Sequence, residues 1–120
     1  MNIYTSYSVK PKPYQSHDVK WKVLIKDKNK NKNKNIFTPG IAINVSRDSA
    51  LIETLGYFSV QQIFPLMINA KINEIKRPIY TMAEAQRIVL QKHRYQIDVS
   101  FKQILPKDKQ FLENLEDYLI

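Results

Sequence analysis

The sequence contains no cysteine, and this absence excludes two kinds of chemistry. Without thiols the chain forms neither disulfide cross-links nor zinc–thiolate sites. The two histidines, His17 and His93, lack a second His, Asp or Glu at metal-ligand spacing, so we expect no metal site. Apolar residues, 43% of the chain, must therefore build the core alone, and 120 residues suffice for one domain.

Glycine is almost as scarce, since it occurs only at positions 40 and 56. A glycine-rich phosphate loop or a dinucleotide fingerprint therefore cannot be built. Acidic pairs such as Glu113 with Glu116 fall on the polar face of an expected helix, where a solvated surface explains them more simply than acid–base catalysis. We find no catalytic constellation, and we expect a non-enzymatic protein with no cofactor.

Long hydrophobic runs are also missing. No stretch approaches the ~20 consecutive apolar residues that cross a bilayer, and the most apolar region is interrupted by Pro65. The first residues lack the basic start and apolar run of a secretory signal. These absences predict a cytoplasmic protein with no membrane partner.

Acidic residues are few in the first quarter of the chain, and the net charge of +8 is concentrated there. Residues 1–34 contain nine lysines and two aspartates, a local charge of +7. Such a patch attracts polyanions or an acidic protein surface. A lysine- and asparagine-rich composition is also what AT-rich coding produces, and this alternative explanation remains open.

Alternation of apolar and polar residues predicts a strand at 19–26. Val19, Trp21, Val23 and Ile25 share its inner face, and lysines occupy the outer face. The alternating Lys-Asn segment that follows has no apolar member, so we expect a flexible hairpin tip at 27–35. Similar patterns predict an edge strand at 3–9 and a strand at 95–101. A further strand is predicted at 41–45, with Ile41, Ile43 and Val45 on one face, and we expect it to pair with 19–26.

Capping and spacing signals predict helices elsewhere. The first helix is expected at 46–56, where Gly56 ends it, and a second starts at Ser59 and is limited by Pro65. A third is expected at 81–94, where Thr81 to Glu84 form a capping box. The fourth follows Pro106 and has an apolar stripe at Phe111, Leu112, Leu115 and Leu119. The fold class predicted is therefore α+β, with a small antiparallel sheet of about four strands packed against two to four short helices in a single domain, 1–120. The exposed edges at 3–9 or 95–101 allow a homodimer through a sheet edge.

One local pattern resembles a known family. Tyr80-Thr81-Met82-Ala83-Glu84-Ala85 is similar to the opening of the first helix in MerR-type and excisionase-type winged helices. The short turn and recognition helix of that family do not follow, because Arg94 leads directly into the predicted strand, and no DNA-contacting residue is carried over.

These patterns support two hypotheses of different classes. The first is a basic accessory factor of a phage, a plasmid or an AT-rich bacterium that binds a polyanion, most plausibly nucleic acid. The alternative is a protein-interaction module or inhibitor that docks on an acidic face of a larger partner, such as a nucleic-acid-processing enzyme. Both depend on Trp21 facing inward and on lysines gathered outside. The residues predicted to bind are Lys10, Lys12, Lys20, Lys22, Lys26, Lys28, Lys30, Lys32 and Lys34.

Overall fold

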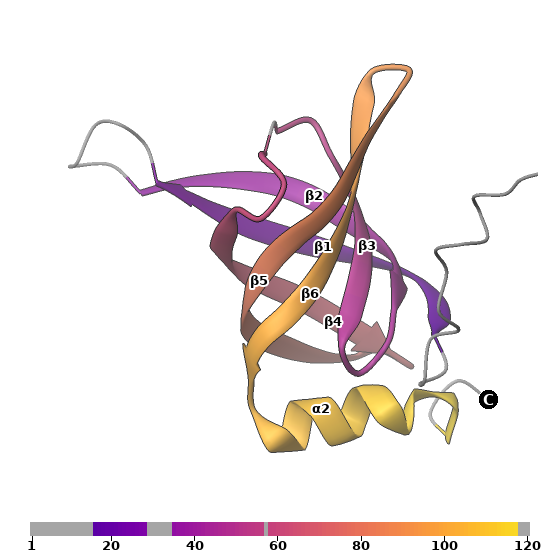
Figure 1. The fold of residues 1–120 in the computed structure, drawn as a ribbon. Helices are drawn as coiled ribbons and strands as arrows, with labels where there is room; N and C mark the ends of the chain where they lie inside the picture. The colour runs from indigo at the N-terminus through magenta and orange to yellow at the C-terminus, as the bar shows by residue number, and fades with distance from the viewer. Residues whose placement is uncertain (1–15, 29–34, 57, 118–120) are drawn as a thin grey trace, which may run out of the picture.

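The computed structural model describes residues 16–28, 35–56 and 58–117, which form six strands and a short helical segment (Figure 1). The predicted strand at 3–9 and most of the Lys-Asn tip lie outside the described residues. The elements are β1 (His17–Lys28), β2 (Asn35–Val45), β3 (Ser49–Thr54), β4 (Ile63–Ile72), β5 (Ile75–Gln91), β6 (Arg94–Ile104), α2 (Pro106–Glu113) and the 3-10 helix η1 (Leu115–Asp117).

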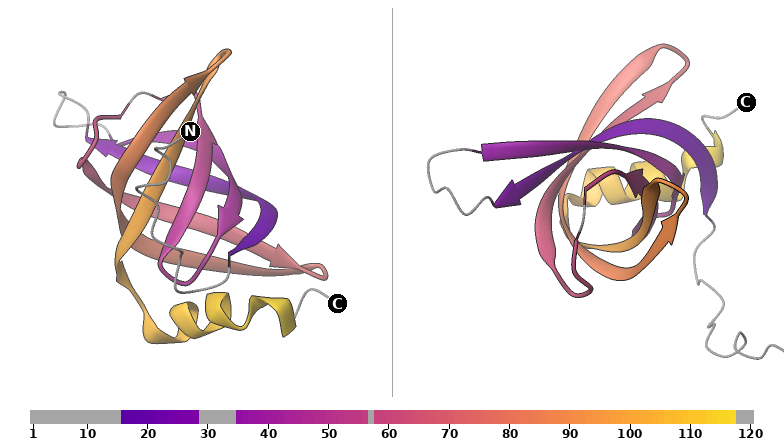
Figure 2. Two further views of the ribbon diagram at one scale, coloured as in Figure 1. Left: turned by 45° about the vertical axis from the view of Figure 1, so that its right-hand side comes forward. Right: turned by 90° about the horizontal axis from the view of Figure 1, so that it is seen from above.

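The six strands form a closed barrel in the order β1-β2-β3-β6-β5-β4, and every pair of neighbours is antiparallel (Figure 2). The prediction of an α+β fold with several helices is therefore wrong. So is the prediction that 95–101 offers a free edge, because β6 pairs with β3 on one side and with β5 on the other. Closure of the barrel leaves no free edge among the six described strands, so a homodimer through 95–101 is excluded, whereas 3–9 lies outside the described residues.

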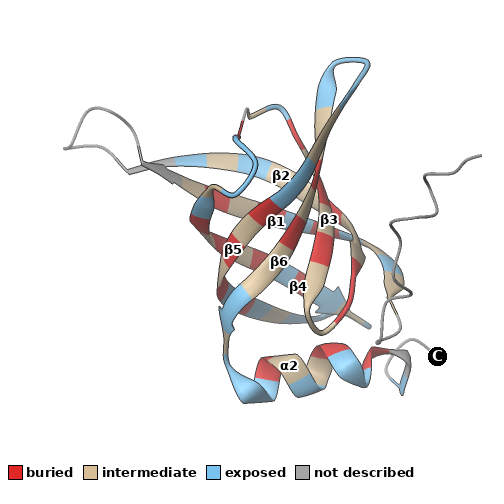
Figure 3. Cartoon of the chain, viewed as in Figure 1, coloured by how far each residue is buried: buried red, intermediate tan, exposed pale blue. Residues whose placement is uncertain are grey.

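Buried residues, which face the barrel interior, recur along the strands between less buried ones (Figure 3). The prediction for 19–26 is confirmed: Trp21 is 5% exposed, and Val23 and Ile25 are buried beside it. The prediction of a strand at 95–101 is also confirmed, with Ile97 and Val99 buried. Other core residues are Ala42, Val45, Ala50, Ile52, Phe58, Phe64, Leu66, Ile68, Ala70, Ile79, Ala83 and Ala85.

Helix α2 lies across one end of the barrel (Figure 1) and confirms the prediction of a helix after Pro106. Leu112, and Leu115 from the following turn, are fully buried in the core. The carboxylate of Asp108, also buried, accepts a hydrogen bond from Arg77 of β5 at 3.0 Å. The guanidinium of Arg77 stacks over the Phe111 ring, 4.6 Å from its centroid. Apolar burial and this paired charge together fix the helix on the barrel.

The segment 81–94, predicted as a helix, belongs instead to strand β5, the turn that follows it and the first residue of β6. Thr81, Ala83 and Ala85 face the interior with period two. The register then shifts between Ala85 and Arg87, so that Ile88 becomes the next residue packed against the core. A β-bulge thus produces the three-residue spacing that resembles a helix.

The other two predicted helices are also absent. Residues 49–54 form β3, with a tight turn before it in which the Ser46 and Ser49 hydroxyls lie 2.9 Å apart. The capping-box pair at 59–62 does interact, since the Ser59 amide donates to Gln62 Oε1 at 2.9 Å. It stabilises a turn and not a helix, because Gln61 has a φ of 72° and the chain enters β4 directly.

The predicted inner face of β2 is wrong except at Val45. Ala42 and Val45 are fully buried, whereas Ile41 and Ile43 are only half-buried. The pairing with β3 skips Ile43, since Ala42 lies opposite Ile52 and Asn44 lies opposite Leu51. The pairing of β2 with β1 itself is confirmed.

Gly40 of β2 lies where two strands approach too closely for a side chain. A Cβ at this position would stand 2.8 Å from the Glu53 carbonyl oxygen and 3.2 Å from Val23 Cγ2. We therefore expect Gly40→Ala to lower the free energy of unfolding by about 1–3 kcal/mol, measured by chemical denaturation. Val60→Ala, in the turn before β4, is the control, because it shortens a side chain that is 55% exposed. Equal stabilities of the two variants would contradict the close approach at Gly40.

Candidate functional site

The outer face of β1 carries those lysines singled out from the sequence whose side chains the structure describes. Lys20 and Lys22 are exposed and Lys26 is half-buried, all on the face of β1 opposite Trp21. This placement is as predicted. The side chain of Lys28 and the residues Lys10, Lys12, Lys30, Lys32 and Lys34 lie outside what the structure describes.

Two further lysines join them from the β4–β5 hairpin. Lys20, Lys22, Lys71 and Lys76, here called the lysine cluster, line one hollow of about 490 Å³ together with Trp21 and Asn69. Strand pairing fixes this arrangement, because Lys22 lies opposite Asn69 and Lys71 lies opposite Lys76. Among the described residues, the ion pair of this cluster is Lys71 with the highly exposed Glu74, at 3.8 Å. The cluster therefore keeps a strong positive potential.

Sequence reasoning missed Lys71 and Lys76 because their place depends on which strands pair. The available signal was the hairpin turn between them. Asn73 and Glu74 have φ angles of 51° and 70°, as a two-residue turn of type I′ requires, and asparagine tolerates this conformation well. A hairpin recognised there would have placed both lysines opposite one another on one face.

The buried Trp21 connects the lysine cluster to the seam of the barrel. β1 pairs with β4 only from Lys22 opposite Asn69 to Ile25 opposite Leu66. Just beyond Lys22, the Trp21 indole donates a hydrogen bond to the Lys71 carbonyl oxygen at 3.1 Å. The Trp21 side chain thus links β1 to β4 beyond the last backbone pair of the two strands, and it holds Lys71 beside β1.

An apolar row crosses the same outer face next to the lysine cluster. It consists of Pro39, Leu24, Met67 and Tyr80, which lie directly opposite one another on β2, β1, β4 and β5. Tyr80 is 61% exposed. Outward positions of a barrel in water are usually polar, so a continuous apolar row is a candidate interaction surface.

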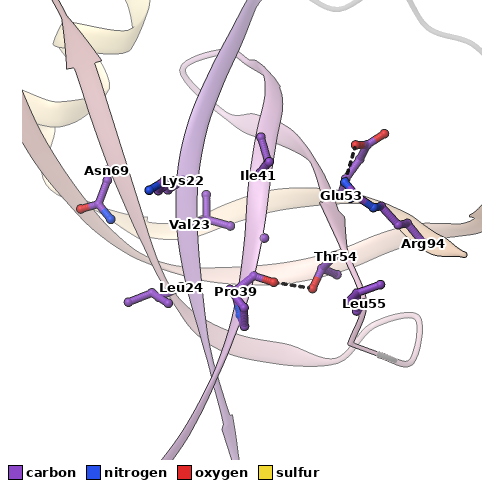
Figure 4. A pocket seen from close by; sticks show the side chains of 11 residues that line it. Lys22, Val23, Leu24, Pro39, Ile41, Glu53, Thr54, Leu55, Asn69 and Arg94 are labelled. Carbon is purple, nitrogen blue, oxygen red and sulfur yellow. Dashed lines mark hydrogen bonds and ion pairs between the residues drawn. The ribbon is translucent and has the colours of Figure 1, made fainter.

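A hollow lies on each side of Leu24. The first, of about 500 Å³, is lined by Leu24, Pro39 and the exposed Leu55, and also by the charged residues Lys22, Glu53 and Arg94 (Figure 4). Its floor is held by a hydrogen bond from Thr54 Oγ1 to the Pro39 carbonyl at 2.9 Å.

The second hollow, here called the cleft, has a volume of about 570 Å³. Its walls are mostly apolar, and none of the described side chains that line it is acidic. The lining residues are Leu24, Lys26, Phe37, Pro65, Leu66, Met67, Tyr80, Thr81, Met82 and Gln103.

The histidines are far apart along the chain and lie on different elements. His17 is half-buried at the start of β1, and His93 is exposed in the turn between β5 and β6. In the part of the chain that the structure describes, no three His, Asp or Glu residues gather as metal ligands. Nor does any helix of those residues have the length and apolarity needed to cross a membrane.

Comparison with known proteins supports the fold alone. No family model matches the chain, and no curated protein matches it either. The chain is similar in structure to the motility inhibitor MotI/DgrA of Bacillus subtilis, with a TM-score of 0.74 and 20% identity over 89% of this chain. It is also similar to YcgR of Escherichia coli in complex with c-di-GMP, with a TM-score of 0.71 and 11% identity over 91% of this chain. The chain spans about half the length of each, 50% and 46%.

Mutual repulsion within the lysine cluster provides a test of its geometry. We expect Lys22→Gln to raise the melting temperature at low ionic strength, by the equivalent of a few tenths of a kcal/mol, because one of four neighbouring like charges is removed. At about 1 M salt, where the screening length is ~3 Å, the difference should vanish. Lys92→Asn, in the turn after β5, is the control and should show no such salt dependence. An unchanged or lower melting temperature for Lys22→Gln at low salt would indicate that these lysines do not repel one another.

Proposed function

We propose that this barrel is a non-enzymatic regulatory module that docks on an acidic face of a larger protein partner. The observation that carries the proposal is the position of the lysine cluster directly beside the apolar row. A group of cations alone is sufficient to bind a polyanion. Cations that border exposed apolar side chains instead match the usual composition of a protein interface, with an apolar centre and a charged rim.

The register of the strands gives this face a defined pattern. Along β1 the outward positions read Lys20, Lys22, Leu24 and Lys26, so charge gives way to apolar surface within a few residues. Neighbouring strands lie ~4.8 Å apart, and outward residues of one strand lie ~7 Å apart. The face therefore spans roughly 14 by 20 Å, which suits the centre of a standard interface.

The comparisons favour a protein partner over nucleic acid. One neighbour is described as an inhibitor of motility. Neither neighbour is described as binding DNA or RNA. An inhibitor or regulatory subunit of this kind also suits a chain in which no catalytic constellation was found.

Charge reversal on β1 tests the proposal. The immobilised protein should retain a stoichiometric acidic protein from nuclease-treated host lysate at low salt, and Lys20→Glu with Lys22→Glu should abolish this retention. Both side chains are exposed, so the fold should persist in circular dichroism. The matched control, Lys92→Asp with Lys107→Glu, changes the net charge equally on other exposed surfaces and should retain the partner.

Two outcomes would contradict this function. Retention by the β1 variant equal to that of the wild type would exclude the lysine cluster as the docking site. Retention of DNA or RNA, with no stoichiometric protein, would favour the polyanion hypothesis.

A second candidate function is response to a cyclic dinucleotide, because one structural neighbour was solved with c-di-GMP. This candidate predicts that c-di-GMP at about 100 times its dissociation constant stabilises the fold by about 2.7 kcal/mol, which raises the melting temperature on the order of 10 °C. Thermal melts with c-di-GMP, and with GMP at equal phosphate concentration as the control, measure this. Equal melting temperatures with both nucleotides would reject the candidate.

A further inference from the structure

We infer that the cleft binds an extended segment of the partner protein, one that carries a large apolar side chain followed within a few residues by acidic residues. This inference rests on the proposed function and specifies the partner's chemistry. It assigns the apolar contact to the cleft and the ionic contact to the lysine cluster.

The cleft exists because two strand pairings differ in length. β1 follows β2 over ten paired positions but follows β4 over only four, ending at Ile25 opposite Leu66. Past Ile25, the β1–β2 hairpin therefore diverges from β4 and β5, as the view from above shows (Figure 2). Phe37 and Lys26, which lie opposite one another on β2 and β1, form one wall. Pro65 and Met82, paired across β4 and β5, belong to the other.

The cleft offers apolar surface that water now covers. Phe37 is 54% exposed and Tyr80 is 61% exposed, so each still has surface to bury. Met67 and Met82 also line the cleft, and the flexible thioether side chain adapts to the shape of an inserted group. Proline at position 65 adds a rigid apolar wall without a backbone donor that would need a partner. A large apolar side chain is therefore the group that this site accommodates.

The lysines near the cleft favour acidic residues beside that apolar side chain. Among the side chains that the structure describes, Lys26 is the charged residue that lines the cleft, and none of those lining it is acidic. The lysine cluster begins at Lys22, one outward step along β1 from Leu24, and continues at Lys20. With outward steps of ~7 Å and an extended chain of ~3.3 Å per residue, acidic groups about two to four residues from the apolar side chain would reach these lysines.

A random library of displayed peptides about twelve residues long, some 40 Å when extended, tests the inference on the full chain. We expect the enriched peptides to contain a large apolar residue and at least two acidic residues at the stated spacing. Phe37→Ser with Tyr80→Ser should weaken the binding of such a peptide by roughly tenfold or more, since anchors in a cleft carry most of the affinity. Leu90→Ser, at a residue 62% exposed near the end of β5, is the matched control and should bind like the wild type.

The variants should all give the circular dichroism and melting curves of the wild type, because each removes an exposed side chain. Peptides that lack acidic residues, peptides that bind the Phe37/Tyr80 variant as well as the wild type, or a library that yields no enrichment would overturn the inference. The inference would also be overturned if the wild type sedimented as a dimer and the Phe37/Tyr80 variant as a monomer, because a second copy of the chain would then occupy the cleft.

The two proposals fail separately. If reversal of Lys20 and Lys22 abolishes partner retention while the Phe37/Tyr80 variant retains the partner fully, the proposed function stands and the cleft is excluded. If reversal of the lysines leaves partner retention unchanged, the proposed function fails, whatever the peptides show.

Discussion

The seam between β1 and β4 is the constraint on which the rest of the molecule depends. It closes the barrel through four residue pairs and the hydrogen bond from the Trp21 indole to the Lys71 carbonyl. Along the described strands, every other pair of neighbours is longer. β2 and β3 share five residue pairs, and the remaining neighbours share six or more. A short seam closes the core, yet it leaves the strands free to diverge beyond each end.

The two ends of this seam explain the outer surface. At one end, the Trp21 bond draws the β4–β5 hairpin against β1, and four lysines gather around Trp21 and Asn69. At the other end, the strands separate and the cleft opens beside Phe37 and Tyr80. One strand, with its inner face in the core, thus presents cations and apolar groups in a fixed order on its outer face.

Local sequence pattern was sufficient where a strand or helix is regular. Trp21, Val23 and Ile25 alternate without a bulge, as do Ile97 and Val99, and both strands were predicted correctly, as was the helix after Pro106. The pattern misled at bulges, since the extra residue in β5 imitates helical spacing. In β2 the extra residue, Ile43, lies between the buried Ala42 and Val45, so the even alternation of Ile41, Ile43 and Val45 does not follow the inner face. Of the lysine cluster, only Lys20 and Lys22 were found, because Lys71 and Lys76 reach it through pairing between distant segments. Barrel closure is non-local in the same way, and no periodicity within one segment encodes it.

The order of strands around the barrel also bears on how the chain folds. β1 and β2 are adjacent in sequence, but β1 finds its second neighbour only when β4, more than forty residues further on, is available. Closing so large a loop has an entropic cost that must be met before the contacts form, and topologies of this kind fold slowly, in milliseconds to seconds. During synthesis the inner side of the β1–β2 hairpin, with Trp21 on it, therefore lacks its second neighbouring strand until β4 has emerged.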